Sequence, residues 1–595
     1  MERIKYILQN LKDYKLITLL LIIATILYAA INLLSSLVLS FIIDNVINNE
    51  TIAFSMHKYL ARTLGGVEYI KTHLYVVAIL LIVIYLIVAL LMAYRQRIQG
   101  IVSENLVKNI RNDLHKHLLD LPYEFHTKVK TGELLQKCTS DVDVIRRFFS
   151  SQFAEIFYII ATAIIALFIL FKMNFKLALF ASISLPIIFL YSYLFFRKIQ
   201  KQFLVSDEAE ARMSTIIEES LSGIRVVKAF NRELYEIKKL EKVNQKYYDV
   251  TYKMILSLGA YWSSSYMICL LGILSVIVMG IFFVRNGSIT IGNFIVFISY
   301  QTMILYPIRN LGRILSDFGK VTVSIDRIMH IINLEVEDLD SGIKPLLNGD
   351  IEFRNVYFRY DNQDVLKNIN LTIKAHQTVA IIGSTGSGKS SLVHLLSRLY
   401  DVNEGVIFIN NHDIKTINKD YLRDNVAIVL QEPFLFSKSI MDNLKIVKDN
   451  ISDEEVFEAC KIASIHDVIK SFENGYDTLV GEKGVTLSGG QKQRLAIART
   501  ILKNNKILIF DDSLSAVDTK TDLLIRNNIK KLDKDITTII VTGRVNSAKD
   551  ADLIYVLEDG CISDYGKHED LIKKDGLYKR IYEIQNEDGG CLNGS

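Results

Sequence analysis

A glycine-rich segment in the second half of the chain combines the residue types that hold phosphate groups. Residues 383–390 read GSTGSGKS, after an apolar run at 378–382 and before a helical pattern of leucines. Glycines let backbone N–H groups close around phosphate oxygens, and the start of a helix adds a favourable dipole. In this strand–loop–helix context the pattern predicts a nucleotide phosphate loop, with Lys389 at the β/γ-phosphates and the Ser390 hydroxyl as a Mg²⁺ ligand. The predicted loop consists of Gly383, Ser384, Thr385, Gly386, Ser387, Gly388, Lys389, Ser390 and Ser391.

A carboxylate that ends an apolar run is the second candidate. Residues 506–511 read KILIFD, so that Asp511 directly follows four apolar residues. An aspartate in this position holds Mg²⁺ in phosphate-loop ATPases. Because many strands end in aspartate, this signal is weak by itself, but downstream of a phosphate loop it indicates an ATPase.

A second anion cradle follows at residues 487–491, which read LSGGQ and lead into a helical pattern at 492–502. The hydroxyl of a serine, the amides of two glycines and a helix N-terminus suit an anion. One nucleotide does not need two phosphate cradles from one chain, so we expect this cradle to serve a nucleotide held by a different chain. Its residues are Ser488, Gly489, Gly490 and Gln491.

The first half of the chain contains six long apolar stretches. They lie near 16–43, 73–94, 152–172, 175–197, 254–284 and 294–315, and a helix needs roughly 20 apolar residues to cross a bilayer. Six such runs favour membrane spans over buried helices of a soluble protein. Lysines and arginines concentrate at the N-terminus and in the connections after the second and fourth spans. This distribution predicts a multi-pass plasma-membrane protein whose N-terminus and C-terminal half are cytoplasmic.

From residue 350 onward, short apolar strands alternate with helical patterns, which predicts a parallel α/β domain. The expected fold is therefore an all-α six-helix transmembrane domain followed by an α/β phosphate-loop ATPase cassette. Its expected divisions are 1–315 for the transmembrane domain, 316–349 for a linker, 350–588 for the cassette and 589–595 for a tail. A net charge of +4 gives no nucleic-acid footprint, and the five cysteines show no disulfide or zinc pattern.

The LSGGQ segment beside a phosphate loop resembles the ABC (ATP-binding cassette) proteins, and six spans before one cassette resemble the half-transporter exporters. This resemblance implies that Tyr360 stacks on adenine and that Gln431 contacts Mg²⁺ and faces the membrane half. It also implies that Glu482 belongs to an exporter-specific loop and that residues 515–518 form a loop across a dimer interface. The family's coupling segments correspond to residues 132–133, 141–143, 223–225 and 228–230.

Two positions depart from the family pattern. The family's catalytic glutamate is Asp512 here, whose side chain is shorter by one methylene, and its switch histidine is Gly543, which has no side chain. Misplacing a general base typically forfeits a factor of about 10²–10⁴ in rate. We therefore expect a site that binds ATP and hydrolyses it poorly, as in the degenerate-site subunit of bacterial heterodimeric exporters.

The expected partners are a second half-transporter chain with a consensus site, the lipid bilayer and a small amphiphilic substrate. Drugs, lipids and hydrophobic peptides all remain open as cargo. A homodimeric lipid flippase and an ATP-sensing gating subunit are the alternatives. Candidate cavity residues are aromatic or neutral polar: Asn32, Tyr261, Trp262, Ser263, Tyr300, Gln301 and Tyr306.

Overall fold

The protein divides into two compact units. The computed structural model describes residues 2–52, 54–361, 363–448, 450–481, 487–513, 517–532 and 535–591. The first unit comprises Met1–Asp120 and Val129–Glu335, and the second comprises Leu121–Lys128 and Val336–Ser595. A short segment between two helices of the first unit is therefore part of the second.

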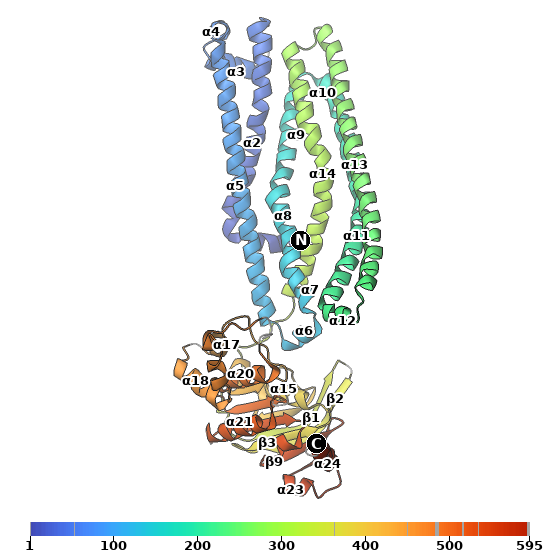
Figure 1. Cartoon of the computed structure of the whole chain (residues 1–595). Helices are drawn as coiled ribbons and strands as arrows, with labels where there is room; N and C mark the ends of the chain where they lie inside the picture. Colours follow the sequence, from blue (N-terminus) through green and yellow to red (C-terminus); the bar gives the residue numbers. More distant parts are fainter. Residues whose placement is uncertain are drawn as a thin grey trace. The chain divides into compact units, whose positions relative to one another are not determined.

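The first unit is helical, and among its described residues six helical segments are long and apolar enough to cross a membrane. Helices α2 and α5 run side by side, as do α11 and α13 (Figure 1). The main helices are α2 (Lys15–Phe41), α5 (Leu74–Asp120), α9 (Phe153–Met173), α11 (Ser184–Ser222), α13 (Glu233–Arg285) and α14 (Ile291–Ile332).

Shorter helical segments connect or extend these spans. The segments α1 (Glu2–Asn10) and η1 (Lys12–Tyr14) precede α2, and η2 (Ile42–Ile47) follows it. Between α2 and α5 lie α3 (Ser55–Thr63) and α4 (Val67–Thr72). The remaining segments are α7 (Thr131–Gln136), η3 (Lys137–Asp141), α8 (Val142–Arg147), η4 (Phe148–Gln152), α10 (Phe175–Ser182) and α12 (Ile224–Ala229).

The long helices continue well beyond the apolar stretches. Helix α13 has 53 residues, so at 1.5 Å per residue it is about 80 Å long, far more than a bilayer core of about 30 Å. Helix α14 continues to Ile332, through the first half of the segment expected to be a linker. The units divide after Glu335, some 20 residues beyond the expected end of the transmembrane domain.

The second unit contains two sheets. A four-stranded antiparallel sheet has the order β2-β1-β4-β5, and a six-stranded sheet has the order β10-β9-β3-β8-β7-β6. In the larger sheet all neighbours are parallel except β9 and β10. The strands are β1 (Ile351–Tyr360), β2 (Gln363–Ile373), β3 (Thr378–Gly383), β4 (Glu404–Ile409), β5 (His412–Asp413), β6 (Val426–Val429), β7 (Ile507–Asp511), β8 (Thr537–Thr542), β9 (Leu553–Glu558) and β10 (Cys561–Gly566).

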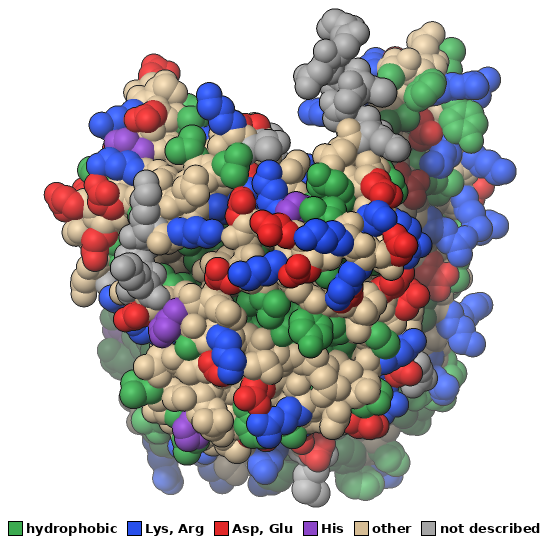
Figure 2. Space-filling model, turned by 90° about the horizontal axis from the view of Figure 1, so that it is seen from below, with side chains coloured by type: hydrophobic (Ala, Val, Ile, Leu, Met, Phe, Trp, Pro, Cys, Tyr) green, Lys and Arg blue, Asp and Glu red, His purple; other side chains and the backbone are tan. Residues whose placement is uncertain are grey.

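Helices surround these sheets. They are α6 (Tyr123–Lys128), α15 (Lys389–Leu396), η5 (Ile414–Thr416), α16 (Lys419–Asn425), α17 (Ile440–Lys445), α18 (Asp453–Ile462), α19 (His466–Lys470), η6 (Gly475–Asp477), α20 (Gly489–Ile501), α21 (Thr519–Leu532), α22 (Val545–Ala548), α23 (His568–Leu571) and α24 (Leu577–Cys591). On the face seen from below, Lys and Arg side chains are interspersed with Asp and Glu (Figure 2), so neither sign of charge dominates there.

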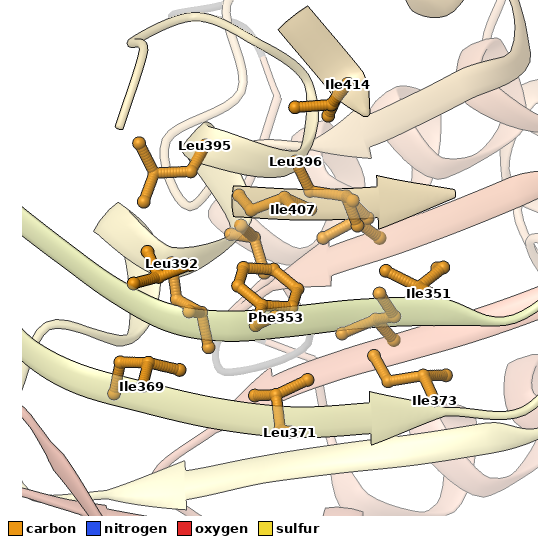
Figure 3. Close-up of a cluster of buried hydrophobic side chains, with 14 of the residues drawn as sticks. Ile351, Phe353, Ile369, Leu371, Ile373, Leu392, Leu395, Leu396, Ile407 and Ile414 are labelled. Carbon is orange, nitrogen blue, oxygen red and sulfur yellow. The ribbon is translucent and has the colours of Figure 1, made fainter. Parts of the chain in front are cut away.

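Two separate hydrophobic cores position the functional segments. In the first, Leu392, Leu395 and Leu396 of α15 lie against the apolar face of the antiparallel sheet, including Phe353 (Figure 3). The second core contains buried side chains of α17, α18, α19 and α20. The helix after the phosphate loop (α15) and the helix after LSGGQ (α20) therefore pack in different hydrophobic cores.

Candidate functional site

The phosphate loop turns sharply between β3 and α15. Gly386 has φ +83° and Gly388 has φ +99°, backbone conformations that strain any residue with a Cβ. Lys389 Nζ donates hydrogen bonds to the loop's own carbonyl oxygens, at 3.0 Å to Gly383 and 2.7 Å to Ser384. Burial lowers the pKa of Lys389, and the nearby carboxylates of Asp512 and Asp511 oppose that shift. Carbonyl oxygens of the loop itself therefore hold the Lys389 side chain across the loop.

The two expected Mg²⁺ ligands that the structure brings together are Ser390 and Asp511. The Ser390 hydroxyl donates a hydrogen bond of 2.9 Å to Asp511 Oδ1. The parallel pairing of β3 with β8, and of β8 with β7, places the carboxyl ends of these strands at one edge of the sheet, where ligands bind in open α/β folds. Burial raises the pKa of Asp511, against the opposing effects of Ser390, His394 and Lys389.

The loop keeps hydrogen-bonding capacity for a ligand. Ser387 Oγ is buried and has no hydrogen-bond partner within the described part of the chain. The exposed residues Ser384, Thr385 and Gly386 form the outer wall of the loop. Hydroxyl and carboxylate oxygens are the hard donors that Mg²⁺ prefers beside phosphate, so the residues present fit a magnesium-bound nucleotide.

The two departing positions lie at the same sheet edge. Asp512 has φ +43°, a left-handed conformation that aspartate tolerates better than most residues, and its N–H donates to Val541 O at 2.9 Å. Burial raises the pKa of Asp512, while Lys389 and Arg544 lower it. At Gly543, an added Cβ would meet no heavy atom within 4 Å. The backbone therefore has room for a side chain where the sequence provides none.

The expected adenine-stacking residue lies in an aromatic cluster. Tyr360 ends β1, and its ring packs edge-on against Phe358 at 4.7 Å and Tyr400 at 5.2 Å between centroids. Its hydroxyl is 3.2 Å from Ser391 Oγ. Burial raises the pKa of Tyr360. Ser391 therefore orients the tyrosine in the described structure.

Helix α6 packs onto this cluster, which the sequence analysis did not foresee. The ring of Tyr123 lies edge-on to Tyr400 at 5.6 Å, and Thr127 Oγ1 is 3.3 Å from the Tyr400 hydroxyl. Lys128 Nζ lies 2.5 Å from Asp361 Oδ1, one residue after the adenine-stacking candidate. The segments that the family resemblance singled out, at 132–133 and 141–143, instead lie on α7, η3 and α8 of the first unit. The only sequence signal for α6 was a short aromatic stretch after Pro122.

The LSGGQ segment caps α20. Ser488 Oγ accepts a hydrogen bond from Gln491 N at 3.3 Å, and Gln491 Oε1 accepts one from Ser488 N at 2.9 Å. This reciprocal arrangement is a capping box. Ser488 and Gly489 are exposed, so the helix N-terminus is open to an incoming anion. The capping box therefore holds the segment on its own helix and leaves this end of α20 free for a ligand.

Several expected site residues are not placed beside Ser390 and Asp511 by the described structure. Gln431, just beyond β6, is exposed, and within the described ranges it makes no hydrogen bond with Ser390 or Asp511. Glu482, and Ser515 and Ala516 of the expected interface loop, lie outside the described residues.

Three of the seven candidate cavity residues in the membrane unit pack helices together. The Tyr300 hydroxyl donates to Leu33 O at 2.8 Å, and Gln301 Nε2 donates to Ser184 Oγ at 2.6 Å. The Tyr261 hydroxyl donates to Arg309 O at 2.9 Å. All three side chains are buried, whereas Trp262 is 37% exposed. The first three therefore have structural partners already.

Fold and site together define a membrane-transport ATPase with six spans and one phosphate-loop cassette. Residues 18–308 match the family model described as ABC transporter transmembrane region, and residues 366–515 match the model described as ABC transporter. Among curated relatives, a Staphylococcus aureus (strain NCTC 8325) protein named "Putative multidrug export ATP-binding/permease protein" is 34% identical over 98% of this chain and 100% of that protein. An uncharacterized ABC transporter ATP-binding protein of Bacillus subtilis (strain 168) is 34% identical over 82% of this chain and 84% of its own length.

A solved structure agrees with these matches. A bacterial Atm1-family ABC exporter, determined with ATP bound, superposes with a TM-score of 0.81 at 26% identity and covers 96% of this chain and 99% of its own. The protein belongs to the ABC transporter family, as an exporter that carries its transmembrane and ATP-binding domains in one chain.

Proposed function

We propose that this chain is the degenerate-site subunit of a two-chain exporter, with a partner chain that supplies the competent catalytic site. The observation that carries the proposal is the pairing of an intact Ser390–Asp511 contact with Asp512 and Gly543 at the same sheet edge. Residues suited to hold ATP and Mg²⁺ are present. The position that would activate the attacking water has the shorter side chain of Asp512, and the position that would sense the γ-phosphate has no side chain, because it is Gly543.

In this proposal the chain's own residues bind and retain the nucleotide. Tyr360 stacks on adenine, the loop amides and Lys389 hold the phosphates, and Ser390 with Asp511 ligates Mg²⁺. Bound Mg²⁺ neutralises phosphate charge and orients the phosphates. The side chain of Asp512 is shorter than that of glutamate, and Gly543 has no side chain to contact the γ-phosphate, so hydrolysis at this site is slow.

The LSGGQ cradle acts on the partner's nucleotide. Its exposed Ser488 and Gly489 begin a helix whose core is separate from that of α15. The exposure of these two residues supports a cradle that can bind a nucleotide held by another chain. ATP then draws two cassettes together, and hydrolysis at the partner's site resets them while the cytoplasmic helices transmit the change to the membrane cavity.

The membrane unit and one relative support a proposed cargo class. Amphiphilic molecules, among them drugs, lipids and hydrophobic peptides, suit a cavity between apolar and aromatic helices. The multidrug export name of the Staphylococcus aureus relative supports the same class.

Co-expression tests the proposal. Full-length chain alone, partner alone and both together are reconstituted in liposomes, and ATP hydrolysis is compared with transport into inverted vesicles. The proposal expects brisk, cargo-stimulated hydrolysis only when both chains are present. Equal specific activity of this chain alone would instead establish the homodimer, and binding of ATP without transport by the pair would establish the gating subunit.

A further inference from the structure

Three arginines lie within or directly after apolar stretches expected to be membrane spans. Arg309 and Arg313 lie within the apolar stretch expected as the sixth span, on α14, and Arg95 directly follows the second span, on α5. A charged side chain at this depth is costly to retain and usually faces a polar pathway or a partner. The sequence analysis gave none of these arginines a binding role, although the charges of Arg309 and Arg313 inside an apolar run were a signal.

Two of these guanidinium groups make cation–π contacts with aromatic rings. The Arg309 guanidinium lies over Trp262 at 5.0 Å and over Tyr306 at 5.4 Å from the ring centroids. The Arg95 guanidinium lies over Tyr28 at 5.2 Å and Tyr158 at 5.8 Å. A cation–π contact engages the positive charge of a guanidinium and leaves its N–H donors available to a carboxylate or phosphate.

Several of these donors have no acceptor. Arg95 Nε and Nη1 and Arg309 Nε are buried and have no hydrogen-bond partner among the residues that the structure describes. A buried donor without an acceptor is destabilising, and charged donors more so than neutral ones. Arg95 and Arg309 can therefore each donate a hydrogen bond to an acceptor that the described chain does not supply.

The nearby acidic groups do not balance the three arginines. Glu155 on α9 interacts electrostatically with both Arg95 and Arg313, so one carboxylate serves two guanidiniums. The next carboxylate along α14, Asp317, accepts a 2.6 Å hydrogen bond from Gln152 and pairs with Lys320 at 3.8 Å. Positive charge is in excess around Glu155.

Helix spacing and the electrostatic interactions of Glu155 link these groups. Arg309 and Arg313 are four residues apart and therefore share a face of α14. Glu155 and Tyr158, three residues apart on α9, connect Arg313 to the Arg95 side. We call Arg95, Arg309, Arg313 and the four rings in cation–π contact with Arg95 and Arg309 the arginine cluster.

We propose that the arginine cluster binds the headgroup of an anionic amphiphile, through a phosphate or carboxylate, as the substrate of this exporter. This inference rests on the proposed export function and names its substrate class. The charge excess and the unpartnered donors favour an anion and disfavour the cationic amphiphiles that an aromatic cavity alone would accept. The apolar tail lies among the surrounding membrane helices.

The single tryptophan gives a direct binding assay, because Trp262 is the only one in the chain and Arg309 makes a cation–π contact with it. Full-length protein is placed in nanodiscs of neutral phosphatidylcholine without nucleotide. Tryptophan fluorescence is titrated with dodecyl phosphate and, separately, with dodecyltrimethylammonium, which has the same tail and the opposite charge. We expect a saturable response to dodecyl phosphate at concentrations at least tenfold lower than any response to the cation.

Substitutions assign the response to the arginines. R309Q and R95Q, on different helices, should each weaken dodecyl phosphate binding about ten- to a hundredfold, the range for losing a charge-assisted hydrogen-bonded pair. R309K keeps the charge and should bind with intermediate affinity. Arg97→Gln, at an exposed position two residues from Arg95 on the same helix, is the matched control and should bind like the wild type.

Equal affinity for the two probes, or unchanged affinity in both R309Q and R95Q, would overturn the inference.

Nanodiscs that contain phosphatidylglycerol distinguish the source of the headgroup. Competition with dodecyl phosphate identifies a membrane lipid, and its absence identifies a free amphiphile. Since binding is read without ATP, brisk hydrolysis by the chain alone would refute the degenerate site and leave this result unaffected.

Discussion

Restoring the family's glutamate and histidine at positions 512 and 543 should convert a site that retains ATP into one that hydrolyses it. The double variant D512E/G543H places a glutamate and a histidine where the family has them. The structure permits both changes, because an added Cβ at Gly543 meets no heavy atom within 4 Å. Asp512 has φ +43°, and a glutamate in that left-handed conformation costs roughly 1 kcal/mol of stability. That cost is small against the stability of a folded domain.

The expected gain follows from the geometry of a general base. One additional methylene extends the carboxylate by about an ångström, and a misplacement of that size costs about 10²-fold in rate. A well-placed general base contributes about 10²–10⁴-fold. We therefore expect turnover by the double variant to rise about 10²-fold or more, equivalent to roughly 3 kcal/mol of barrier at 1.4 kcal/mol per factor of ten.

The assay uses the full-length chain alone in nanodiscs with saturating ATP and Mg²⁺, followed by phosphate release. Because the LSGGQ segment is intact, a homodimer of the double variant holds two complete sites. D512E/G543A adds a Cβ without the imidazole and should recover only part of the gain, and D512N should leave the slow wild-type rate nearly unchanged. The reasoning is refuted if the double variant is no faster than the wild type, or if D512N abolishes a wild-type rate that is already fast.

Three further predictions concern stability, the second cradle and adenine binding. E337Q should lower the apparent Tm of the detergent-solubilised chain by about 6–12 °C, since Glu337 pairs bidentately with Arg423 at 2.7 and 2.8 Å and with Lys419 at 3.1 Å, and breaking a buried pair costs about 3 kcal/mol or more. Ser488→Arg should leave ATP binding by this chain unchanged but suppress hydrolysis by the two-chain assembly at least tenfold, by blocking the cradle. Tyr360→Ala should weaken binding of a fluorescent ATP analogue by roughly tenfold, the loss expected for a base-stacking contact.

The Glu337 prediction carries a pH dependence. Burial alone would raise the pKa of Glu337, but the hydrogen bonds from Arg423 and Lys419 outweigh it and the pKa is lowered. The folded pKa thus lies below the unfolded value near 4.3, so the stabilisation is complete above about pH 5 and is lost as the pH falls through the folded pKa. The Tm difference between wild type and E337Q should accordingly shrink under acid. Glu335→Gln, exposed two residues earlier, should show no difference at any pH, and a pH-independent gap for E337Q would contradict the linkage.

Local sequence patterns were sufficient to predict the spans and the α/β cassette. Six apolar runs and GSTGSGKS each carry their signal within a few tens of residues, and the structure contains six apolar helices and an α/β cassette at those places. Ser390 and Asp511 were predicted separately as Mg²⁺ ligands, and the parallel sheet brings the loop after β3 and the end of β7 to one edge, where the two side chains meet.

The length of the sixth helix was missed for a physical reason. Beyond residue 315 the buried residues Val321, Ile325 and Ile328 recur at helical spacing, but exposed charged residues between them interrupt any apolar run. A search for runs therefore ends the span early, whereas helical periodicity continues to Ile332. The membrane boundary and the helix boundary are different quantities.

Contacts between distant segments could not be read from the sequence. The packing of α6 against Tyr400 joins residues about 270 positions apart, and no local pattern encodes that pairing. The arginine cluster similarly depends on α5, α9 and α14 coming together. Only the presence of charge inside a span signalled it in advance.

The fate of the nucleotide bound to this chain tests the central claim most directly. The two-chain assembly is allowed to turn over Mg²⁺ and 8-azido-ATP labelled at either the α- or the γ-phosphate, then irradiated, and the label on each chain is counted after separation. The account predicts that this chain keeps α- and γ-label in equal amounts, because its nucleotide remains ATP, while the partner keeps only α-label. Loss of γ-label from this chain at the same rate as from its partner would contradict the account.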